Sequence, residues 1–404
     1  MTQTHYDVGR PVLQVATMAT AMTVAVLLQV VFGALGPFIV DDLGLSRTQL
    51  GALTTAMYVS AALLSTAGGR VVDRLGARPP LLGLFGVMAI SVVIVAAAPT
   101  YLILVLGSLL AGLSIAIANP VTNRMIQTSI AAQRQGLVTG IKQSGIQVGV
   151  FIGSAALPVI AGLAGWRTAT LVCLAPTAVG AMMTLRSVPA SARQVSRQGS
   201  GSWANLPTGT GWLTAYAFAM GVGISSVSAY LPLFGVEDLG LAKTVAGLLS
   251  AVVGGVAMVA RLGWGVIADR VPSALRWALT AMALLAISGA AMLIGAATLW
   301  FWLVWVGAAV IGISTAAWNG MAMLAVIRQA PAHVAGLASG VVVLGFYSGF
   351  AAGPIVFGGV VDATDSYALG WAMVTGAAVI SVGLSLVWRQ TVYATPTDYI
   401  RKTP

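Results

Sequence analysis

Charged residues are scarce in this chain. Its 404 residues include 20 Lys and Arg and 10 Asp and Glu, so 7% of the positions are charged, whereas a soluble domain carries about 25%. So few charges cannot cover a water-exposed surface, which excludes a soluble globular protein. Hydrophobic residues make up 58%, in charge-free runs as long as the roughly 20 residues of a spanning helix. We therefore expect an all-α membrane protein.

Cysteine is almost absent. The one cysteine, Cys173, excludes an internal disulfide and argues against a metal cluster, so no metal and no cofactor is expected. The net charge of +10 is spread over short loops and is not gathered on one face, so no nucleic-acid partner is expected. The first hydrophobic run is too long for a cleavable signal peptide. The expected surroundings are the lipid bilayer.

Hydropathy, interrupted by Pro, Gly and charged residues, predicts twelve spanning helices. Their predicted limits are 12–38, 48–68, 80–98, 101–126, 136–160, 166–186, 211–234, 244–265, 277–297, 300–327, 334–360 and 367–388. An even number of spans puts both termini on one side of the membrane.

The loops give the orientation. Fourteen Lys or Arg lie on the side of the termini, and three, Arg47, Arg167 and Lys243, lie on the other. Basic loops stay in the cytoplasm, so we expect a multi-pass protein of the cytoplasmic (inner) membrane with both termini cytoplasmic. The polar stretch 189–210 predicts a cytoplasmic linker between an N-terminal six-helix bundle (1–188) and a C-terminal one (211–404).

The two predicted bundles repeat each other. The sequence DLGL at Asp42 recurs 196 residues later at Asp238, and beyond that the offset becomes 200, where Asn119 matches Asn319. Two related six-helix halves around a central site are the architecture of a secondary transporter.

The segment Gly69–Arg78, which reads GRVVDRLGAR, resembles the loop signature of the major facilitator superfamily between helices 2 and 3, and Gly265–Arg270 is its weaker second copy. The resemblance covers the whole chain. It implies the major facilitator fold, two pseudo-symmetric six-helix bundles that work by alternating access, and we expect a monomer. It also implies gating or structural roles for the signature residues Gly69, Asp73, Arg74, Gly76, Arg78, Gly265, Asp269 and Arg270.

Three cations lie within predicted spans and break the repeat: Arg261 corresponds to Ser65, Lys142 to Val342 and Arg124 to Leu324. A cation in a spanning helix is costly, which makes it a candidate for function. The segment RLGWGVIADR from Arg261 is similar to helix 8 of nitrate/nitrite porters and monocarboxylate transporters, which implies that Arg261 contacts an anionic substrate. The alternative for Arg261 and Lys142 is a side chain that reaches the membrane surface.

Arg124 follows Asn123 in a pattern, Asn119-Pro120-Val-Thr-Asn123-Arg124, that resembles helix 4 of the anion:cation symporters. For Arg124 a gate and a ligand contact remain equally open. The other polar or aromatic candidates are Gln29, Tyr58, Gln143, Gln147, Tyr230, Asn319 and Tyr347. For each of these, a hydrogen bond between helices is the alternative.

All ten acidic residues fall in tails, loops or helix ends. Without a carboxylate in the spans, a cation substrate and an Asp or Glu proton relay are disfavoured. The sequence therefore predicts a secondary active or facilitative transporter of a small anion, with an organic carboxylate as the leading class and nitrate- or cyanate-like ions as the other. Its coupling partner, a proton on Lys142 or a counter-anion, stays open.

The alternative function is export of hydrophobic drugs. Gly349-x-x-x-Gly353-Pro354 is similar to the Gly-Pro element of drug antiporters, although those carry it in helix 5. No pair of nucleophile and base lies in the spans, so an enzyme is not expected.

Overall fold

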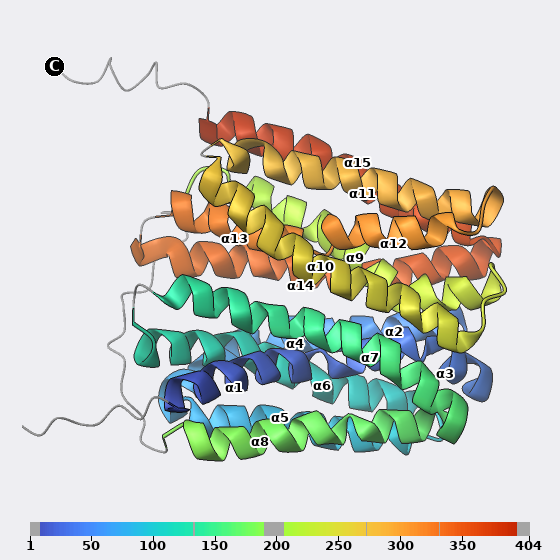
Figure 1. The fold of residues 1–404 in the computed structure, drawn as a ribbon, viewed down its shortest axis with the longest axis horizontal. Coiled ribbons are helices and arrows are strands. Elements are labelled where there is room, and N and C mark those ends of the chain that lie inside the picture. Colours follow the sequence, from blue (N-terminus) through green and yellow to red (C-terminus); the bar gives the residue numbers. More distant parts are fainter. Residues whose placement is uncertain (1–8, 132–133, 190–205, 272, 331, 394–404) are drawn as a thin grey trace, which may run out of the picture.

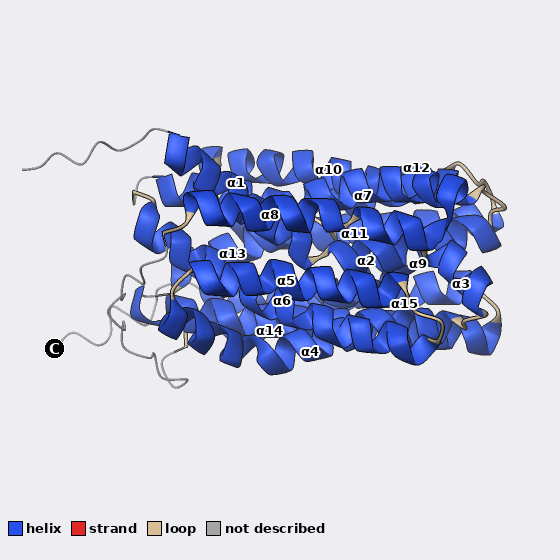
Figure 2. Ribbon diagram, turned by 90° about the horizontal axis from the view of Figure 1, so that it is seen from below, coloured by secondary structure: helices blue, strands red, loops and turns tan. Residues whose placement is uncertain are grey.

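The computed structural model describes residues 9–131, 134–189, 206–271, 273–330 and 332–393. Every regular element in these ranges is an α-helix, and the long helices run side by side along one direction (Figure 2). Most of the predicted linker 189–210 lies outside the described residues.

The first eight helices form one half of the molecule and the other seven form the second half (Figure 1). The first half contains α1 (Gly9–Ala25), α2 (Leu27–Ala34), α3 (Gly36–Leu43), α4 (Arg47–Leu75), α5 (Arg78–Ala96), α6 (Tyr101–Ser129), α7 (Gln135–Val172) and α8 (Leu174–Ser187). The second half contains α9 (Thr210–Glu237), α10 (Lys243–Arg270), α11 (Ala274–Thr298), α12 (Leu303–Ile313), α13 (Trp318–Gln329), α14 (Ala332–Thr364) and α15 (Tyr367–Tyr393).

Twelve passes account for these helices. Ten helices are long and apolar enough to cross a membrane, and the pair α1 and α2, bent by 44°, makes an eleventh span. The continuous 53 residues from Gln135 to Ser187 turn back at Gly165, whose φ of 84° lies in the left-handed region that glycine favours. That turn separates the predicted spans 136–160 and 166–186.

Two spans predicted as single helices are broken. The span predicted at 12–38 consists of α1, α2 and α3, with non-helical residues at Val26 and Leu35. Pro37 explains the second break, because its ring clashes with the helix before it and it has no N–H; the local sequence does not explain the break at Val26. The span predicted at 300–327 is divided into α12 and α13 by residues 314–317.

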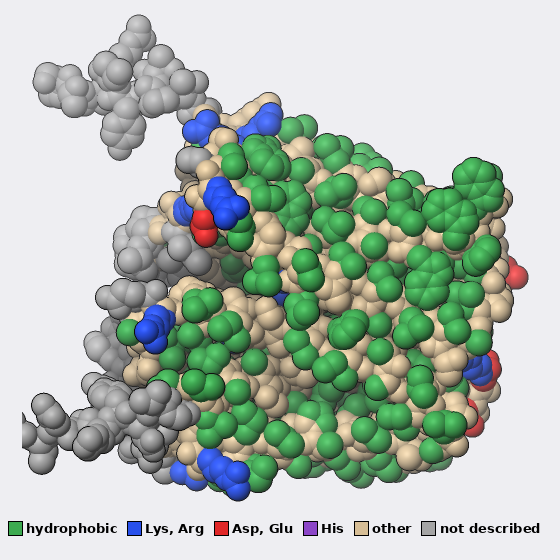
Figure 3. Space-filling model, viewed as in Figure 1, with side chains coloured by type: hydrophobic (Ala, Val, Ile, Leu, Met, Phe, Trp, Pro, Cys, Tyr) green, Lys and Arg blue, Asp and Glu red, His purple; other side chains and the backbone are tan. Residues whose placement is uncertain are grey.

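The starts of α1 and α9 and the ends of α8 and α15 lie at one end of the bundle, here called the tail end, and the opposite end is called the far end (Figure 1). The halves meet where α4 contacts α14, α7 contacts α10 and α2 contacts α9. Hydrophobic side chains cover the middle of the face seen in Figure 3, and charged ones gather at the two ends. This is the surface of a protein surrounded by lipid along its length.

Candidate functional site

A belt of polar side chains crosses the middle of the molecule and links six helices of both halves. From α10, Arg261 donates through Nη1 to the backbone oxygen of Gln143 on α7 (3.3 Å), and the Gln143 amide donates to Asn119 on α6 (3.4 Å). Asn119 donates to the Tyr347 hydroxyl on α14 (3.5 Å). We call this set, together with Tyr58 and Gln29 described next, the central belt.

Tyr58 and Gln29 complete the central belt on α4 and α2. The Tyr58 hydroxyl donates to Oε1 of Gln29 at 2.5 Å, and both side chains are buried. The Tyr58 ring packs on Tyr347 with 5.6 Å between ring centroids and on Phe350 with 4.4 Å. Tyr58, Gln143, Arg261 and Tyr347 were thus predicted separately from the sequence and lie in one connected group.

Arg261 is the charged member of the central belt. A second hydrogen bond runs from its Nη2 to the backbone oxygen of Ala316 at 2.9 Å, in the gap between α12 and α13. Its Nε is buried and, among the described residues, has no hydrogen-bond partner. Both partners of Arg261 are neutral backbone oxygens, so its positive charge meets no carboxylate within the described part of the chain.

Lys142 lies beside the central belt and is turned toward α6. Its Nζ donates to Oγ1 of Thr122 (2.9 Å) and to Oδ1 of Asn123 (2.5 Å), and 1% of the residue is exposed. The Thr122 hydroxyl in turn donates a hydrogen bond to the backbone oxygen of Ala118 at 2.6 Å. Lys142 and Arg261 therefore have different partners in this conformation, although Lys142 is adjacent in α7 to Gln143, which accepts from Arg261.

Arg124 contacts the signature loop. Its guanidinium lies 3.6 Å from the Asp73 carboxylate and donates to the Asp73 backbone oxygen at 3.3 Å. In the second half Arg328 lies 3.9 Å from the Asp269 carboxylate and donates to the Ala268 backbone oxygen at 3.4 Å. The second half thus makes the equivalent contact with Arg328. This residue lies one helical turn after Leu324, which the repeat offset of 200 matches to Arg124.

The remaining predicted residues have separate positions. Gln147 is buried on α7, one turn beyond Gln143. The Tyr230 hydroxyl donates to the backbone oxygens of Arg47 (2.6 Å) and Pro354 (2.8 Å), at the far end and away from the central belt. In the signature, Gly76 ends α4 with a φ of 80°, which favours glycine. The other signature residues, Gly69, Arg74, Arg78, Gly265 and Arg270, lie at the tail ends of α4, α5 and α10.

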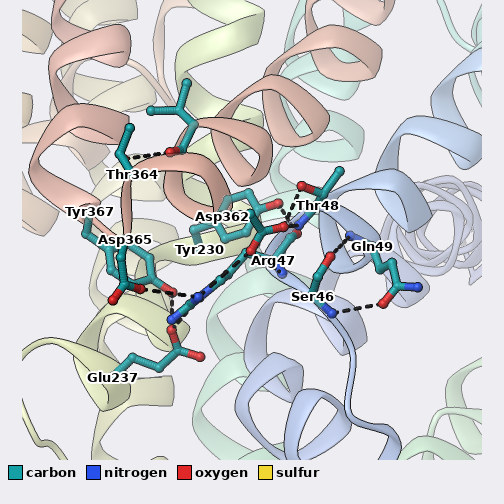
Figure 4. A network of polar contacts seen from close by, with 11 residues as sticks. Ser46, Arg47, Thr48, Gln49, Tyr230, Glu237, Asp362, Thr364, Asp365 and Tyr367 are labelled. Carbon is teal, nitrogen blue, oxygen red and sulfur yellow. Dashed lines mark hydrogen bonds and ion pairs between the residues drawn. The ribbon is translucent and has the colours of Figure 1, made fainter.

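The far end carries a polar cluster that the sequence analysis missed (Figure 4). Arg47, the first residue of α4, forms ion pairs with Glu237 at 2.9 Å, Asp365 at 3.5 Å and Asp362 at 3.9 Å, all from the second half. Asp362 also accepts hydrogen bonds from the backbone N–H groups of Arg47 (3.1 Å) and Thr48 (2.8 Å). A carboxylate of one half thus caps the N-terminus of a helix of the other.

The ion pairs between the halves follow the repeat. Arg47 corresponds to Lys243 and Asp41 to Glu237 at the offset of 196. Arg47 pairs with Glu237, and Lys243 pairs with Asp41. Each half therefore gives one cation to the acid of the other. We call Arg47, Glu237, Asp362, Asp365, Lys243 and Asp41 the far-end latch. Its signal in the sequence was the repetition of both charges at equivalent positions.

Close backbone packing accompanies the far-end latch. A Cβ on Gly51 would lie 2.3 Å from the Pro354 backbone oxygen, and one on Gly358 would lie 2.6 Å from that of Arg47. These glycines let α4 and α14 touch across the halves. A small cavity of about 20 Å³ lies where α2, α7, α9 and α10 meet, with Gln29 and Ser228 in its wall. The latch and these glycines thus hold the two halves together at the far end.

The tail end differs. The tail-end ion pairs of the described residues, Arg124 with Asp73 and Arg328 with Asp269, each lie within one half. Among the described residues all ion pairs that join the halves belong to the far-end latch. No group of His, Cys, Asp or Glu in the described ranges could hold a metal ion.

The family follows from this fold and from comparison with known proteins. The model of the Major Facilitator Superfamily matches residues 16–354. The chain belongs to this superfamily and is a transporter, not an enzyme.

Several known proteins are similar to this chain at low sequence identity. The nitrite extrusion protein of Bacillus subtilis (strain 168) is 25% identical over 94% of this chain and 95% of its own length. The probable sulfoacetate transporter of Cupriavidus necator is 29% identical over 34% of this chain and 32% of its own length. The hexuronate transporter of Bacillus subtilis is 28% identical over 32% of this chain and 31% of its own length.

Solved structures share the fold. A bacterial homologue of the human lysosomal transporter Spinster, in an inward-facing and occupied conformation, has a TM-score of 0.76 at 15% identity and covers 96% of this chain and 99% of its own. The nucleoside transporter NupG has a TM-score of 0.74 at 14% identity and covers 93% of this chain and 99% of its own. At this identity the likeness concerns the fold alone.

Proposed function

We propose that this transporter moves a small anion across the cytoplasmic membrane by alternating access, and that Arg261 is its main contact with the anion. The observation that carries the proposal is the state of Arg261. Its guanidinium lies where the two halves meet, bonded only to neutral oxygens, with a buried Nε that no described residue bonds. A cation without a counter-ion in a low-dielectric interior attracts an anion.

The chemistry of the surrounding groups agrees with this substrate. The central belt supplies hydroxyl and amide groups from Tyr58, Gln143 and Tyr347, and none of its members is acidic. Amide and hydroxyl donors beside a guanidinium can bind the oxygens of a carboxylate or nitrite. Nitrite, sulfoacetate and hexuronates, for which the relatives are named, are all anions. An organic carboxylate is the leading class, and nitrate- or cyanate-like ions are the other.

The conformation supports access from the tail end. The far-end latch and the packing of α4 on α14 close the far end, whereas no such pairs join the halves among the described tail-end residues. The excess of Lys and Arg in the tail-end loops supports a cytoplasmic tail end. We infer that this state opens to the cytoplasm. Gly349 and Pro354, the drug-exporter element, serve here in packing and in bonding α14 to α9.

The test is a ligand screen followed by one substitution. Thermal shift of the purified protein against mono- and dicarboxylates, nitrite, nitrate, cyanate and hydrophobic cationic drugs should identify a stabilising anion. For that anion, Arg261→Lys should raise the dissociation constant about 30-fold, because a Lys lacks the planar fork, and breaking a desolvated charge pair costs roughly 2–5 kcal/mol.

Arg276→Lys is the control, because Arg276 is exposed at the tail end of α11 and should leave the constant unchanged. Stabilisation by drugs alone would overturn the anion proposal. Equal dissociation constants for wild type and Arg261→Lys would move the anion site away from Arg261.

A further inference from the structure

Spans 4 and 10 are equivalent in the repeat, yet one is continuous and the other is broken. The fourth span, α6, runs unbroken from Tyr101 to Ser129 and even contains Pro120. The tenth span ends α12 at Ile313, where Ser314 has φ −108° and ψ −85°, and resumes as α13 at Trp318. Ser314 corresponds to Ser114, so the local residue does not explain the break.

At the break, backbone oxygens lose the N–H donors that a continuous helix would provide. Side chains of α10 donate to two of these oxygens. Trp264 donates through Nε1 to the Ile313 oxygen at 3.0 Å, and Arg261 donates through Nη2 to the Ala316 oxygen at 2.9 Å. In a membrane interior, backbone groups without a partner are costly, so non-helical backbone is tolerated only where protein satisfies it.

The first half has neither the break nor the donors. The equivalents of Trp264 and Arg261 are Gly68 and Ser65. A Cβ on Gly68 would lie 2.9 Å from the Ala116 oxygen, so α4 packs directly on the unbroken α6 there. The Ser65 hydroxyl bonds within its own helix, to the Ala62 oxygen. The break and its two donors therefore occur together in one half and are absent together from the other.

The two donors are not alike. Trp264 has a single neutral N–H, which is fully used, and its ring packs on Trp277 with 6.2 Å between centroids. Arg261 is charged, also reaches Gln143 in the other half, and keeps an unbonded Nε. An anion can therefore bind Arg261 and draw it away from Ala316, whereas it does not attract the neutral Trp264.

We propose that residues 314–317 form a hinge in span 10. The hydrogen bond from Trp264 to the Ile313 oxygen, here called the pin, stays in place and holds the hinge. When an anion binds Arg261, the hydrogen bond from Arg261 to the Ala316 oxygen breaks. This inference rests on the proposed function, because the anion contact of Arg261 is its premise. It assigns Trp264 as a positioning residue of transport that does not touch the substrate.

Motion at the hinge reaches the tail end through α13. Trp318, the first residue of α13, packs on Tyr216 and Phe346 with centroid distances of 5.6 Å and 5.5 Å. Arg328, near its last turn, pairs with Asp269 of the second signature. When the anion binds Arg261, the hinge loses its hydrogen bond from Arg261 of α10, and α13 can move at the tail end.

Hydrogen exchange followed by mass spectrometry on the detergent-purified full chain tests the hinge. The peptide covering 311–320 is compared with its repeat equivalent 111–120, which lies in the continuous α6 and serves as the internal control. The probes are sodium nitrite, sodium sulfoacetate and sodium glucuronate, each against sodium chloride at matched ionic strength.

In wild type, a stabilising probe should speed exchange at 311–320 about tenfold and leave 111–120 unchanged, because Ala316 loses a buried donor. Arg261→Gln should abolish this response. Without any probe, Trp264→Phe should already speed exchange at 311–320 by about tenfold, and Trp264→Gln, which keeps an N–H donor, should restore the wild-type rate. Probe affinity should stay within about threefold in Trp264→Phe.

The outcomes separate the two proposals. A probe that stabilises the protein without changing exchange at 311–320 overturns the hinge and leaves the anion transporter standing. If no anion stabilises wild type, the proposed function fails. The exchange rate at 311–320 in Trp264→Phe without a probe then still shows whether Trp264 holds the hinge. Equal exchange at 311–320 in Trp264→Phe and wild type overturns the pin.

Discussion

Lys142 is a buried cation, and the equivalent position in the other half is the apolar Val342. Lys142 bonds Thr122 and Asn123, and the equivalents of these three residues at the offset of 200 are Val342, Ala322 and Met323. Three polar side chains that contact each other are thus replaced together by three apolar ones. The helix contact itself can be made without charge, which points to a role for Lys142 in transport.

Transferring the apolar set into the first half tests this role. The triple variant Lys142→Val, Thr122→Ala and Asn123→Met should fold, and its melting temperature should rise by about 2–4 °C for each kcal/mol gained by removing a buried charge that lacks a counter-ion. Uptake of the identified anion into proteoliposomes should fall to background. A stable triple variant with wild-type uptake would leave Lys142 only a packing role.

At the scale of elements, the broken first span is anchored at its far end by one carboxylate. Asp42, in α3, accepts hydrogen bonds from Arg167 (2.5 Å) and Trp166 (3.0 Å) of α7. The Arg167 hydrogen bond, with that of Trp166, lowers the pKa of Asp42 below its usual value. A lowered pKa means that the folded state favours the charged carboxylate.

The sign of the pH effect follows. The contribution of Asp42 is fully present above the unfolded pKa of about 3.9 and is lost as the pH falls through the lower, folded pKa. Asp42 and Arg167 are partly exposed, so at pH 7 Asp42→Asn should cost about 0.2–1 kcal/mol, the range of solvent-screened pairs. Thermal unfolding at pH 7 and at pH 3 measures this.

The difference between wild type and Asp42→Asn should shrink at pH 3. Adding Asp42→Asn to Arg167→Gln should then have little further effect at pH 7, because the partner is already gone. A constant difference at both pH values would show that the charge of Asp42 does not anchor α3.

At the scale of the whole molecule, the far-end latch biases the balance between the two halves. Its two repeat-related pairs, Arg47 with Glu237 and Lys243 with Asp41, can form only when the far ends are together. Alternating access requires that they separate. Arg47→Gln should therefore shift the population toward states that are open at the far end.

Labelling of a cysteine behind the latch reports this shift. In a Cys173→Ser background, Ser228→Cys, in the wall of the small cavity, should react with an impermeant thiol reagent from the far side about three- to tenfold faster when Arg47→Gln is added, since exposed pairs contribute about 0.2–1 kcal/mol each. Arg167→Gln, which breaks a far-end pair within one half, is the control and should not change the rate. Equal rates with and without Arg47→Gln would mean that packing alone holds the far end closed.

The sequence by itself determined the membrane class, the twelve passes, the repeat and the superfamily. These depend on short-range features, because a span is a continuous apolar run and the signature is a continuous segment. It also indicated Gln29, Tyr58, Gln143, Arg261 and Tyr347 of the central belt, since polar side chains within spans are few. The roles of those residues stay predictions.

Tertiary structure alone decided which residues meet. Gln143 and Arg261 are 118 positions apart, and Arg47 and Glu237 are 190 apart, so no local pattern could pair them. The break of span 10 depends on donors from α10, because its own residues resemble those of the unbroken span 4. Arg124 appeared to break the repeat, but Arg328 makes the equivalent contact from a position one turn away. Side chains of this length can reach the same partner from neighbouring turns, and only the folded molecule fixes which one does.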